Sequence, residues 1–251
     1  HFLKKRQVFM NYFLSFVAYS FLGWCCETTY CSIGAGHFIN RGFLSGPVCP
    51  VYGFGAMAVI LLLEPVKNSA ALVFLLGMAV ASVLEYITGW LLETLFHTKW
   101  WDYSTYRFNI HGRVCLRNSL MFGGLAIVAV QILNPWVQKQ IALIPFWWRL
   151  GLVGAIGLYF AADTAITVQT ILELNGRLEQ MQNLVLEMKA RQQEHRQALE
   201  ARLQERLRQL AQSSKLRHRR LLQAFPNMRS SRYQAALEKL KEELAEKRRS
   251  R

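Results

Sequence analysis

Hydrophobic and polar positions are segregated along this chain instead of being mixed throughout it. Five long apolar stretches fill its first two-thirds, and each has close to the roughly 20 residues that a helix needs to cross a bilayer. They span residues 8–30, 47–63, 70–96, 114–133 and 145–172. Backbone groups in lipid must be satisfied within the chain, so the stretches predict helices and not open strands.

The last third of the chain has another pattern, in which apolar residues recur three and four positions apart with polar residues between them. The spacing runs through Leu178, Met181, Val185 and Met188 and then through Leu199, Leu203, Leu207 and Leu210. It is typical of a helix with one apolar stripe, as in a coiled coil. We therefore predict an all-α protein, with a polytopic transmembrane helix bundle over residues 8–172 and a coiled-coil-like helical tail over 173–251.

The distribution of charge supports this division. The chain has 251 residues and a formal net charge of +14, and residues 177–251 contain 19 of its 30 Lys and Arg. A soluble domain carries about a quarter of its residues as charges, whereas the apolar part of this chain carries far fewer. The bundle therefore belongs in a membrane. Since basic segments stay in the cytoplasm, we expect a cytoplasmic tail.

The orientation of the first segments leaves two possibilities. Five crossings with a cytoplasmic tail put the N-terminus outside, and the loops 31–46 and 97–113 then face the cytoplasm. The basic residues 4–6 would lie on the wrong side. A start at Met10, or a re-entrant second segment, would remove that conflict, because prolines at 47 and 50 break helix geometry there.

A parallel internal repeat is predicted from one recurring offset. Residues 23–28 (GWCCET) and 89–94 (GWLLET) share four identities at an offset of 66, which also aligns Gly46 with Gly112 and Cys49 with Cys115. Such repeats place sites between their halves. Chance similarity between membrane segments rich in glycine and aromatic residues is the alternative.

Acidic residues within the spans are the first candidates for a site. Glu27 and Glu93 close the two repeats, and Glu85 lies two turns before Glu93 on the same helix face. A carboxylate in a span costs a few kcal/mol and needs a partner, for which Arg41 and Arg113 in the following loops are suited. Glu27 and Glu93 could instead be interfacial anchors for these loops.

Polar residues of the loops and of the last span complete the candidate set. Asp102 and Asn109 lie in the second loop, and Asp163 lies in the fifth span, where it either pairs with an arginine or lines a path. We expect the two loops to form a polar vestibule. The candidates for a translocation path are Glu27, Glu85, Glu93, Arg41, Asp102, Asn109, Arg113 and Asp163.

The five cysteines predict no metal site. Cys25, Cys26, Cys31, Cys49 and Cys115 contain no CxxC pair, so buried structural thiols are favoured over zinc ligands and over a disulfide framework.

Four stretches of this chain resemble one family. They are residues 19–27 (YSFLGWCCE), 40–56 (NRGFLSGPVCPVYGFGA), 85–104 (EYITGWLLETLFHTKWWDYS) and 109–123 (NIHGRVCLRNSLMFG). They are similar to motifs of the ABC-transporter type IV, or CmpB-like, integral membrane proteins of bacteria, over about residues 11–172. The resemblance implies a permease subunit in the bacterial cytoplasmic membrane. Since the chain has no G-x-x-x-x-G-K-[ST] loop, ATP would be bound only by a separate ATPase subunit.

Three functions follow from these features. A transport protein is favoured, with no cofactor in this chain. The alternatives are a membrane enzyme acting on a lipid or lipid-linked substrate, for which no nucleophile–base spacing is legible, and a membrane scaffold or sensor.

The predicted partners divide between the bundle and the tail. Five spans make a small permease, so we expect a homo-oligomer or a partner helix bound through the tail. The basic residues 217–220 and 247–249 suggest contact with anionic lipid headgroups. Nucleic acid is not expected, because nothing in the tail would contact bases.

Overall fold

The computed structural model describes residues 2–190, 196–212 and 216–249. Among these residues the structure is almost wholly helical, which confirms the all-α prediction, and the strands it contains are two residues long. The chain forms two compact units. We call residues 1–91 and 102–165 the bundle unit, and residues 92–101 and 166–251 the tail unit. The predicted boundary at residue 172 lies inside one continuous helix.

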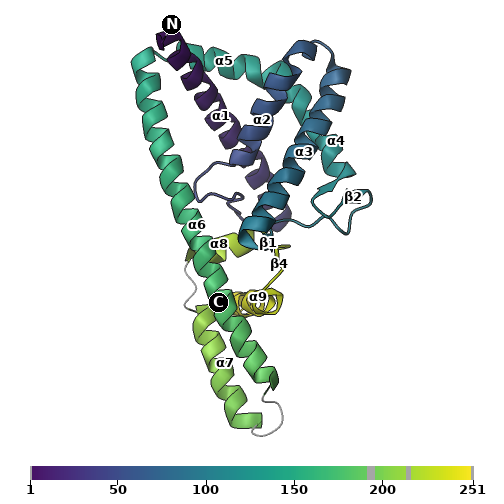
Figure 1. The fold of residues 1–251 in the computed structure, drawn as a ribbon, viewed down its shortest axis with the longest axis vertical. Helices are drawn as coiled ribbons and strands as arrows, with labels where there is room; N and C mark the ends of the chain where they lie inside the picture. Colours follow the sequence, from purple (N-terminus) through teal and green to yellow (C-terminus); the bar gives the residue numbers. More distant parts are fainter. Residues whose placement is uncertain (1, 191–195, 213–215, 250–251) are drawn as a thin grey trace. The chain divides into compact units, whose positions relative to one another are not determined.

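The helices of the bundle unit follow one another along the chain, with long loops before α2 and before α4 (Figure 1). They are α1 (Phe2–Ala35), α2 (Pro50–Leu63), the short 3₁₀ helix η1 (Glu64–Val66), α3 (Ala70–Phe96), α4 (Leu116–Ile127), the π-helical η2 (Val128–Leu133), α5 (Asn134–Leu143) and α6 (Phe146–Ala190). The last turns of α3 and the second half of α6 belong to the tail unit.

Four of the five predicted spans are confirmed as helices long and apolar enough to cross a membrane: 5–35, 70–96, 116–143 and 146–189. The second is different. Helix α2 has 14 residues, about 21 Å of rise, which is short of a hydrocarbon core of about 30 Å. It begins beside the middle of α1, where the Cys49 N–H donates to the Ser20 carbonyl at 2.9 Å. The preceding segment, residues 36–49, is a loop packed within the bundle unit.

The fourth span extends beyond its predicted end. Asn134-Pro135 was expected to stop the helix, because proline lacks an N–H, but helical structure continues to Leu143. Pro135 occupies the first turn of α5, and the π-helical stretch Val128–Leu133 comes directly before it. The π-helical turn is wider than an α-helical one and changes the hydrogen-bond register. The N–H that Pro135 lacks therefore falls in the first turn of α5, where no helical partner is needed.

The core of the bundle unit lies where α1, α2, α3, α4 and α5 meet. Its buried side chains are Leu14, Tyr19, Val59, Ile60, Leu63, Val73, Ala126, Val130, Val137 and Ile141. Polar contacts join α1 to α5, where the Tyr19 hydroxyl donates to Asn134 Oδ1 at 2.9 Å. Large apolar side chains such as Trp147 and Leu158 are exposed instead, as expected for a surface in contact with lipid.

The tail unit has its own core. The second half of α6 is followed by α7 (Arg196–Gln212), α8 (Leu216–Ala224), β4 (Arg229–Ser230) and α9 (Gln234–Arg249). Leu178, Met181, Leu203 and Leu207 of the predicted coiled-coil stripe are buried inside this unit. The stripe is therefore covered, at these positions, by the chain itself. Self-association through the tail stays a prediction.

The basic residues of the tail are described only in part. His218, one of the residues expected to contact headgroups, is fully buried, with Nε2 3.9 Å from Glu173 Oε2. That expectation was wrong for His218, because a side chain in a core cannot reach a lipid surface. The side chains of basic residues 217, 219 and 247–249 lie outside the described residues. The side chain of Leu199, from the predicted apolar stripe, lies outside them as well.

The segment after α3 is part of the tail unit. Strand β1 (Thr98–Lys99) pairs antiparallel with β4, with Thr98 opposite Ser230. Trp100, which is 5% exposed, meets the rings of Phe96 and Phe225 edge to face, with ring centroids 6.4 and 4.9 Å away. This aromatic cluster fixes residues 96–100 to the tail unit.

Substitution Trp100→Ala is expected to destabilise the tail unit by about 3–5 kcal/mol, because it removes a large buried ring. Hydrogen exchange of α8 and α9 in the purified protein measures this loss as faster exchange. Leu186→Ala, at a side chain that is 51% exposed on α6, is the control and should stay within about 0.5 kcal/mol of wild type. Equal exchange in the two variants would contradict the prediction.

Candidate functional site

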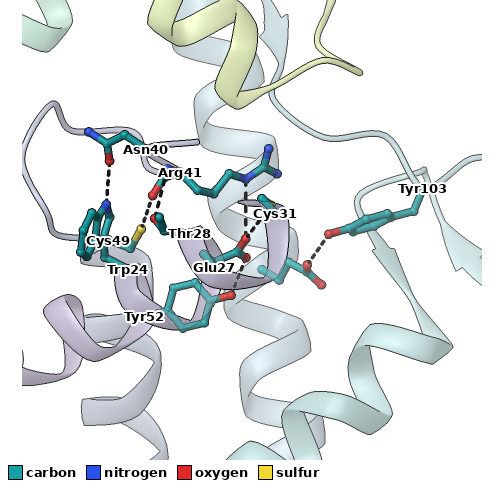
Figure 2. A network of polar contacts seen from close by, with 10 residues as sticks. Trp24, Glu27, Thr28, Cys31, Asn40, Arg41, Cys49, Tyr52 and Tyr103 are labelled. Atoms are coloured by element: carbon teal, nitrogen blue, oxygen red, sulfur yellow. Dashed lines mark hydrogen bonds and ion pairs between the residues drawn. The ribbon is translucent and has the colours of Figure 1, made fainter. Parts of the chain in front are cut away.

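Glu27 on α1 is held by two side chains. The Tyr52 hydroxyl donates to Oε1 at 2.5 Å, and Arg41 Nε lies 3.6 Å from Oε2 (Figure 2). The predicted pairing of Glu27 with Arg41 is thus present in the structure. The thiol of Cys31 lies 3.9 Å from Oε2 as a weak third partner. Both carboxylate oxygens of Glu27 are therefore occupied.

Residues of the GWCCET motif hold the loop 36–49 against α1. The indole of Trp24 donates to Asn40 Oδ1 at 2.6 Å, and the hydroxyl of Thr28 accepts from the Arg41 N–H at 3.2 Å (Figure 2). These bonds place Arg41 beside Glu27. The motif residues thus hydrogen-bond to the loop. This explains why they are spaced along the one side of the helix that faces it.

Gly23 has a steric role in the same site. A Cβ atom built on Gly23 would overlap the side chain of Tyr52. The absence of a side chain at this position lets Tyr52 pack on α1 and reach Glu27. Any larger residue at position 23 would displace the phenol.

Asp163 on α6 holds the other side of the loop. Its Oδ1 accepts from the Ser45 N–H at 3.1 Å, and its Oδ2 accepts from the Gly46 N–H at 2.8 Å. Asp163 is 5% exposed. Of the two roles considered for it, pairing with an arginine or lining a path, the described contacts show neither. They are those of a carboxylate that satisfies loop backbone.

Glu85 on α3 is less completely bonded than Glu27. Its Oε1 accepts from the Tyr103 hydroxyl at 3.3 Å. Its other oxygen, Oε2, is buried and has no hydrogen-bond partner among the described residues. Glu85 therefore has bonding capacity that Glu27 does not.

Tyr103 connects the two glutamates electrostatically. Burial raises the pKa of its phenol above the usual value, and the charges of Glu85 and Glu27 raise it further. The phenol therefore stays a hydrogen-bond donor at neutral pH. We group the two glutamates with the side chains that contact them as the polar cluster, which we define as Glu27, Arg41, Tyr52, Glu85 and Tyr103.

Asp102 and Asn109 support the loop that carries Tyr103. Strands β2 (Asn109–Ile110) and β3 (Val114–Cys115) form a hairpin. Asp102 Oδ1 accepts from the Ser104 N–H at 3.0 Å, and Asn109 Oδ1 accepts from the Gly112 N–H at 3.1 Å. Gly112 has φ +68°, a conformation that favours glycine, and a Cβ there would lie 2.6 Å from Asp102 Oδ1. Both side chains thus stabilise turns.

The remaining two candidates are Arg113 and Glu93. Arg113 lies over the ring of Tyr86, 5.3 Å from its centroid, and donates to its hydroxyl at 3.3 Å. Glu93 belongs to the tail unit. A vestibule that includes Glu93 stays a prediction.

Tyr52 and Tyr103 are site residues that the sequence analysis missed. Tyrosines are common near the ends of spans, where they lie at the membrane interface. Neither Tyr52 nor Tyr103 therefore stood out as a site residue. One signal could have identified them. A tyrosine hydroxyl in an apolar setting requires a hydrogen-bond partner, and the glutamates of the spans are the acceptors available there.

The family model described as "Putative ABC-transporter type IV" matches residues 14–168. The chain belongs to this family. The predicted resemblance is therefore confirmed over the bundle. Searches of curated proteins and of solved structures found no match to the chain. The whole polar cluster, together with Asp163, lies within the region that the family model covers.

Two cysteines of this family region share one local setting. Cys49 and Cys115 each occupy the N-cap position of the next helix with extended backbone, at φ −119° and −138°, and both are buried. These two fit the predicted structural thiols, while Cys26 is exposed and Cys25 and Cys31 are half-buried. The residues that the structure describes contain no group of His, Cys, Asp and Glu suited to a metal ion. The shared setting agrees with the repeat, which stays a prediction.

Substitution Gly46→Ala is expected to destabilise the bundle unit by about 1–3 kcal/mol. Its Cβ would overlap the Tyr159 hydroxyl and lie 3.1 Å from Asp163 Oδ2, so the Asp163 contact must open. Thermal unfolding in detergent should show a lower Tm. Gly154→Ala, on α6 with nothing within 4 Å of its Cβ, is the control and should unfold at or above the wild-type Tm, because alanine favours a helix over glycine. A Gly46→Ala variant as stable as this control would refute the assignment.

Substitution Tyr52→Phe is expected to cost about 1–3 kcal/mol, because it leaves one oxygen of Glu27 without its hydrogen bond. Tyr12→Phe is the control, since the Tyr12 side chain is 46% exposed. Denaturation of both variants in one detergent measures the difference. Equal stabilities would show that the Tyr52–Glu27 bond contributes nothing measurable.

Proposed function

We propose that this chain is the permease subunit of an ABC-type transporter and moves a small solute or ion across the bacterial cytoplasmic membrane. The family supplies the transporter class, and four helices of sufficient length and apolarity support a multi-pass protein. One observation carries the proposal: Glu85, on α3 in an apolar bundle, has a buried carboxylate oxygen without a hydrogen bond among the described residues.

The cost of these carboxylates is the reason to assign them a function. A charged side chain within a span costs about 2.5–3.5 kcal/mol on insertion scales. The structure meets part of this cost for Glu27 through Arg41 and Tyr52. Glu85 keeps a buried oxygen without a hydrogen bond among the described residues. A merely structural acid would be expected to have both oxygens satisfied, so Glu85 is the residue that we assign to the solute path.

The chain would use ATP only through a partner. Its 251 residues contain no G-x-x-x-x-G-K-[ST] loop, so hydrolysis belongs to a separate ATPase subunit. The basic tail would lie in the cytoplasm, on the side where ATP is available. In this arrangement the chain supplies the path and the partner supplies the energy.

The enzyme alternative has less support from the site. Asp102 and Asn109, which could have served acid–base chemistry, bond to turn backbone, and His111 pairs with the Tyr86 hydroxyl at 3.0 Å. The Cys31 thiol lies 3.9 Å from Glu27 Oε2, farther than the ~2.6–3.2 Å that joins a nucleophile to its base. Transport therefore accounts for more of the geometry than catalysis does.

The test is purification of the tagged full-length chain from its native membrane in mild detergent. An ATPase subunit should co-purify. Glu85→Gln should lower the rate of ATP hydrolysis by the complex at least about tenfold, because losing one contact with the solute worth about 1.4 kcal/mol in the transition state has that effect. Glu64→Gln is the control, because Glu64 is exposed and pairs with Lys67 at 2.6 Å. A functional complex without any ATPase would count against the ABC-type assignment.

A further inference from the structure

The β2–β3 hairpin, which leads directly into α4, is strongly basic (Figure 1). Residues 105–117 contain three arginines and one histidine and no Asp or Glu. The turn is held by Asn109, which accepts from the Gly112 N–H at 3.1 Å and donates to the carbonyls of Ser104 and Tyr106. None of these turn bonds involves a basic side chain, so the positive charge of the hairpin calls for another explanation.

Two of the basic side chains meet at one phenol. Arg113 Nη1 donates to the Tyr86 hydroxyl at 3.3 Å, and His111 Nδ1 lies 3.0 Å from the same oxygen. A guanidinium can only donate, so the phenol gives its own proton to Nδ1, the acceptor that the described residues offer it. A neutral His111 then carries its hydrogen on Nε2, on a side chain that is exposed. An imidazole N–H and a planar guanidinium are donors that suit a phosphate group.

The phenol and its two partners lie where spans end. Tyr86 belongs to the span 70–96, and helix α3 leaves the bundle unit after Leu91. The next span, 116–143, begins three residues after Arg113. Side chains that connect the end of one span to the turn before the next are expected in the headgroup layer of the bilayer. Phosphate groups are the anions of that layer.

Apolar side chains of the same hairpin are exposed beside these donors. Phe108 is 76% exposed and Ile110 is 57% exposed. Phe108 also has φ +54°, a backbone conformation that is costly for a bulky residue, and such conformations are found at ligand-binding segments. An inorganic anion would leave both side chains in water, whereas a lipid supplies a phosphate together with an apolar region that covers them.

We propose that His111 and Arg113 bind the phosphate of an anionic phospholipid, and that Tyr86 positions both side chains. Phe108 and Ile110 would lie against the apolar part of the same lipid. This lipid contact is formed by the bundle unit itself, in addition to the one expected for the basic tail. The proposal does not rest on the proposed function, because lipid binding here involves neither ATP nor a transported solute.

The experiment is native mass spectrometry of the purified full-length protein after delipidation in detergent. It measures the Kd for phosphatidylglycerol and for phosphatidylcholine with the same acyl chains. Wild type should bind phosphatidylglycerol about tenfold more tightly, because basic residues attract a headgroup with net negative charge. Equal affinities for the two lipids would overturn the proposal.

The arginine variants test the site itself. Arg113→Gln should weaken phosphatidylglycerol binding about tenfold, the effect of losing one charge-assisted hydrogen bond. Arg113→Lys should recover only part of the affinity, because lysine keeps the charge and lacks the planar fork. Arg107→Gln, at an exposed arginine of the same hairpin, is the matched control and should lose clearly less affinity than Arg113→Gln. An equal loss in Arg107→Gln and Arg113→Gln would overturn the site, since overall charge alone would then explain binding.

Two asparagine variants separate binding from folding and a lipid from free phosphate. His111 and Phe108 have positive φ, which asparagine tolerates, so His111→Asn and Phe108→Asn should keep at least the wild-type Tm without lipid. Both should bind phosphatidylglycerol more weakly than wild type, and unchanged affinity in His111→Asn would overturn the proposal. Inorganic phosphate should leave the wild-type Tm unchanged. A saturable rise that Phe108→Asn retains would identify free phosphate as the ligand and overturn the assignment to a lipid.

Discussion

Asp163 accepts hydrogen bonds from the backbone of Ser45 and Gly46, and the arrangement of the bundle unit depends on this interaction. The loop 36–49 has no helical hydrogen bonds of its own, yet it packs among apolar helices. Irregular backbone in such a place persists only if other groups satisfy it. Asp163 does so from α6 and Thr28 does so from α1, while Trp24 of α1 donates to the Asn40 side chain. The loop in turn places Arg41 beside Glu27 and starts α2 beside Ser20.

The same constraint explains the small residues around the loop. A Cβ atom would have no room at either of two glycines. Tyr52 packs directly on the backbone of Gly23, and Tyr159 packs directly on that of Gly46. At Gly23 the close approach lets the Tyr52 phenol reach Glu27 of α1. Two acids in the bundle differ in their bonding. Both oxygens of Asp163 accept from loop backbone, whereas Glu85 has a buried oxygen without a hydrogen bond among the described residues.

The polar cluster and the tail are related through one continuous piece of chain. Residues 92–101 belong to the tail unit, and Tyr103 of the cluster follows two residues later. The tail is therefore more than a solvated basic helix. It has a core of its own that includes Trp100, Leu178 and Leu207, and that core includes the segment leading to the site.

The sequence by itself determined four of the apolar helices, the family and the pairing of Glu27 with Arg41. Each depends on local composition or spacing, which the chain carries wherever it folds. Tertiary structure alone decided that the second span is a loop followed by a short helix, since this depends on whether distant groups satisfy its backbone. It also decided that Asp102 and Asn109 stabilise turns, that Tyr52 and Tyr103 reach the glutamates, and that the leucine stripe of the tail is covered within the chain. A polar residue shows that it needs a partner, but which partner it finds depends on packing between segments far apart in sequence.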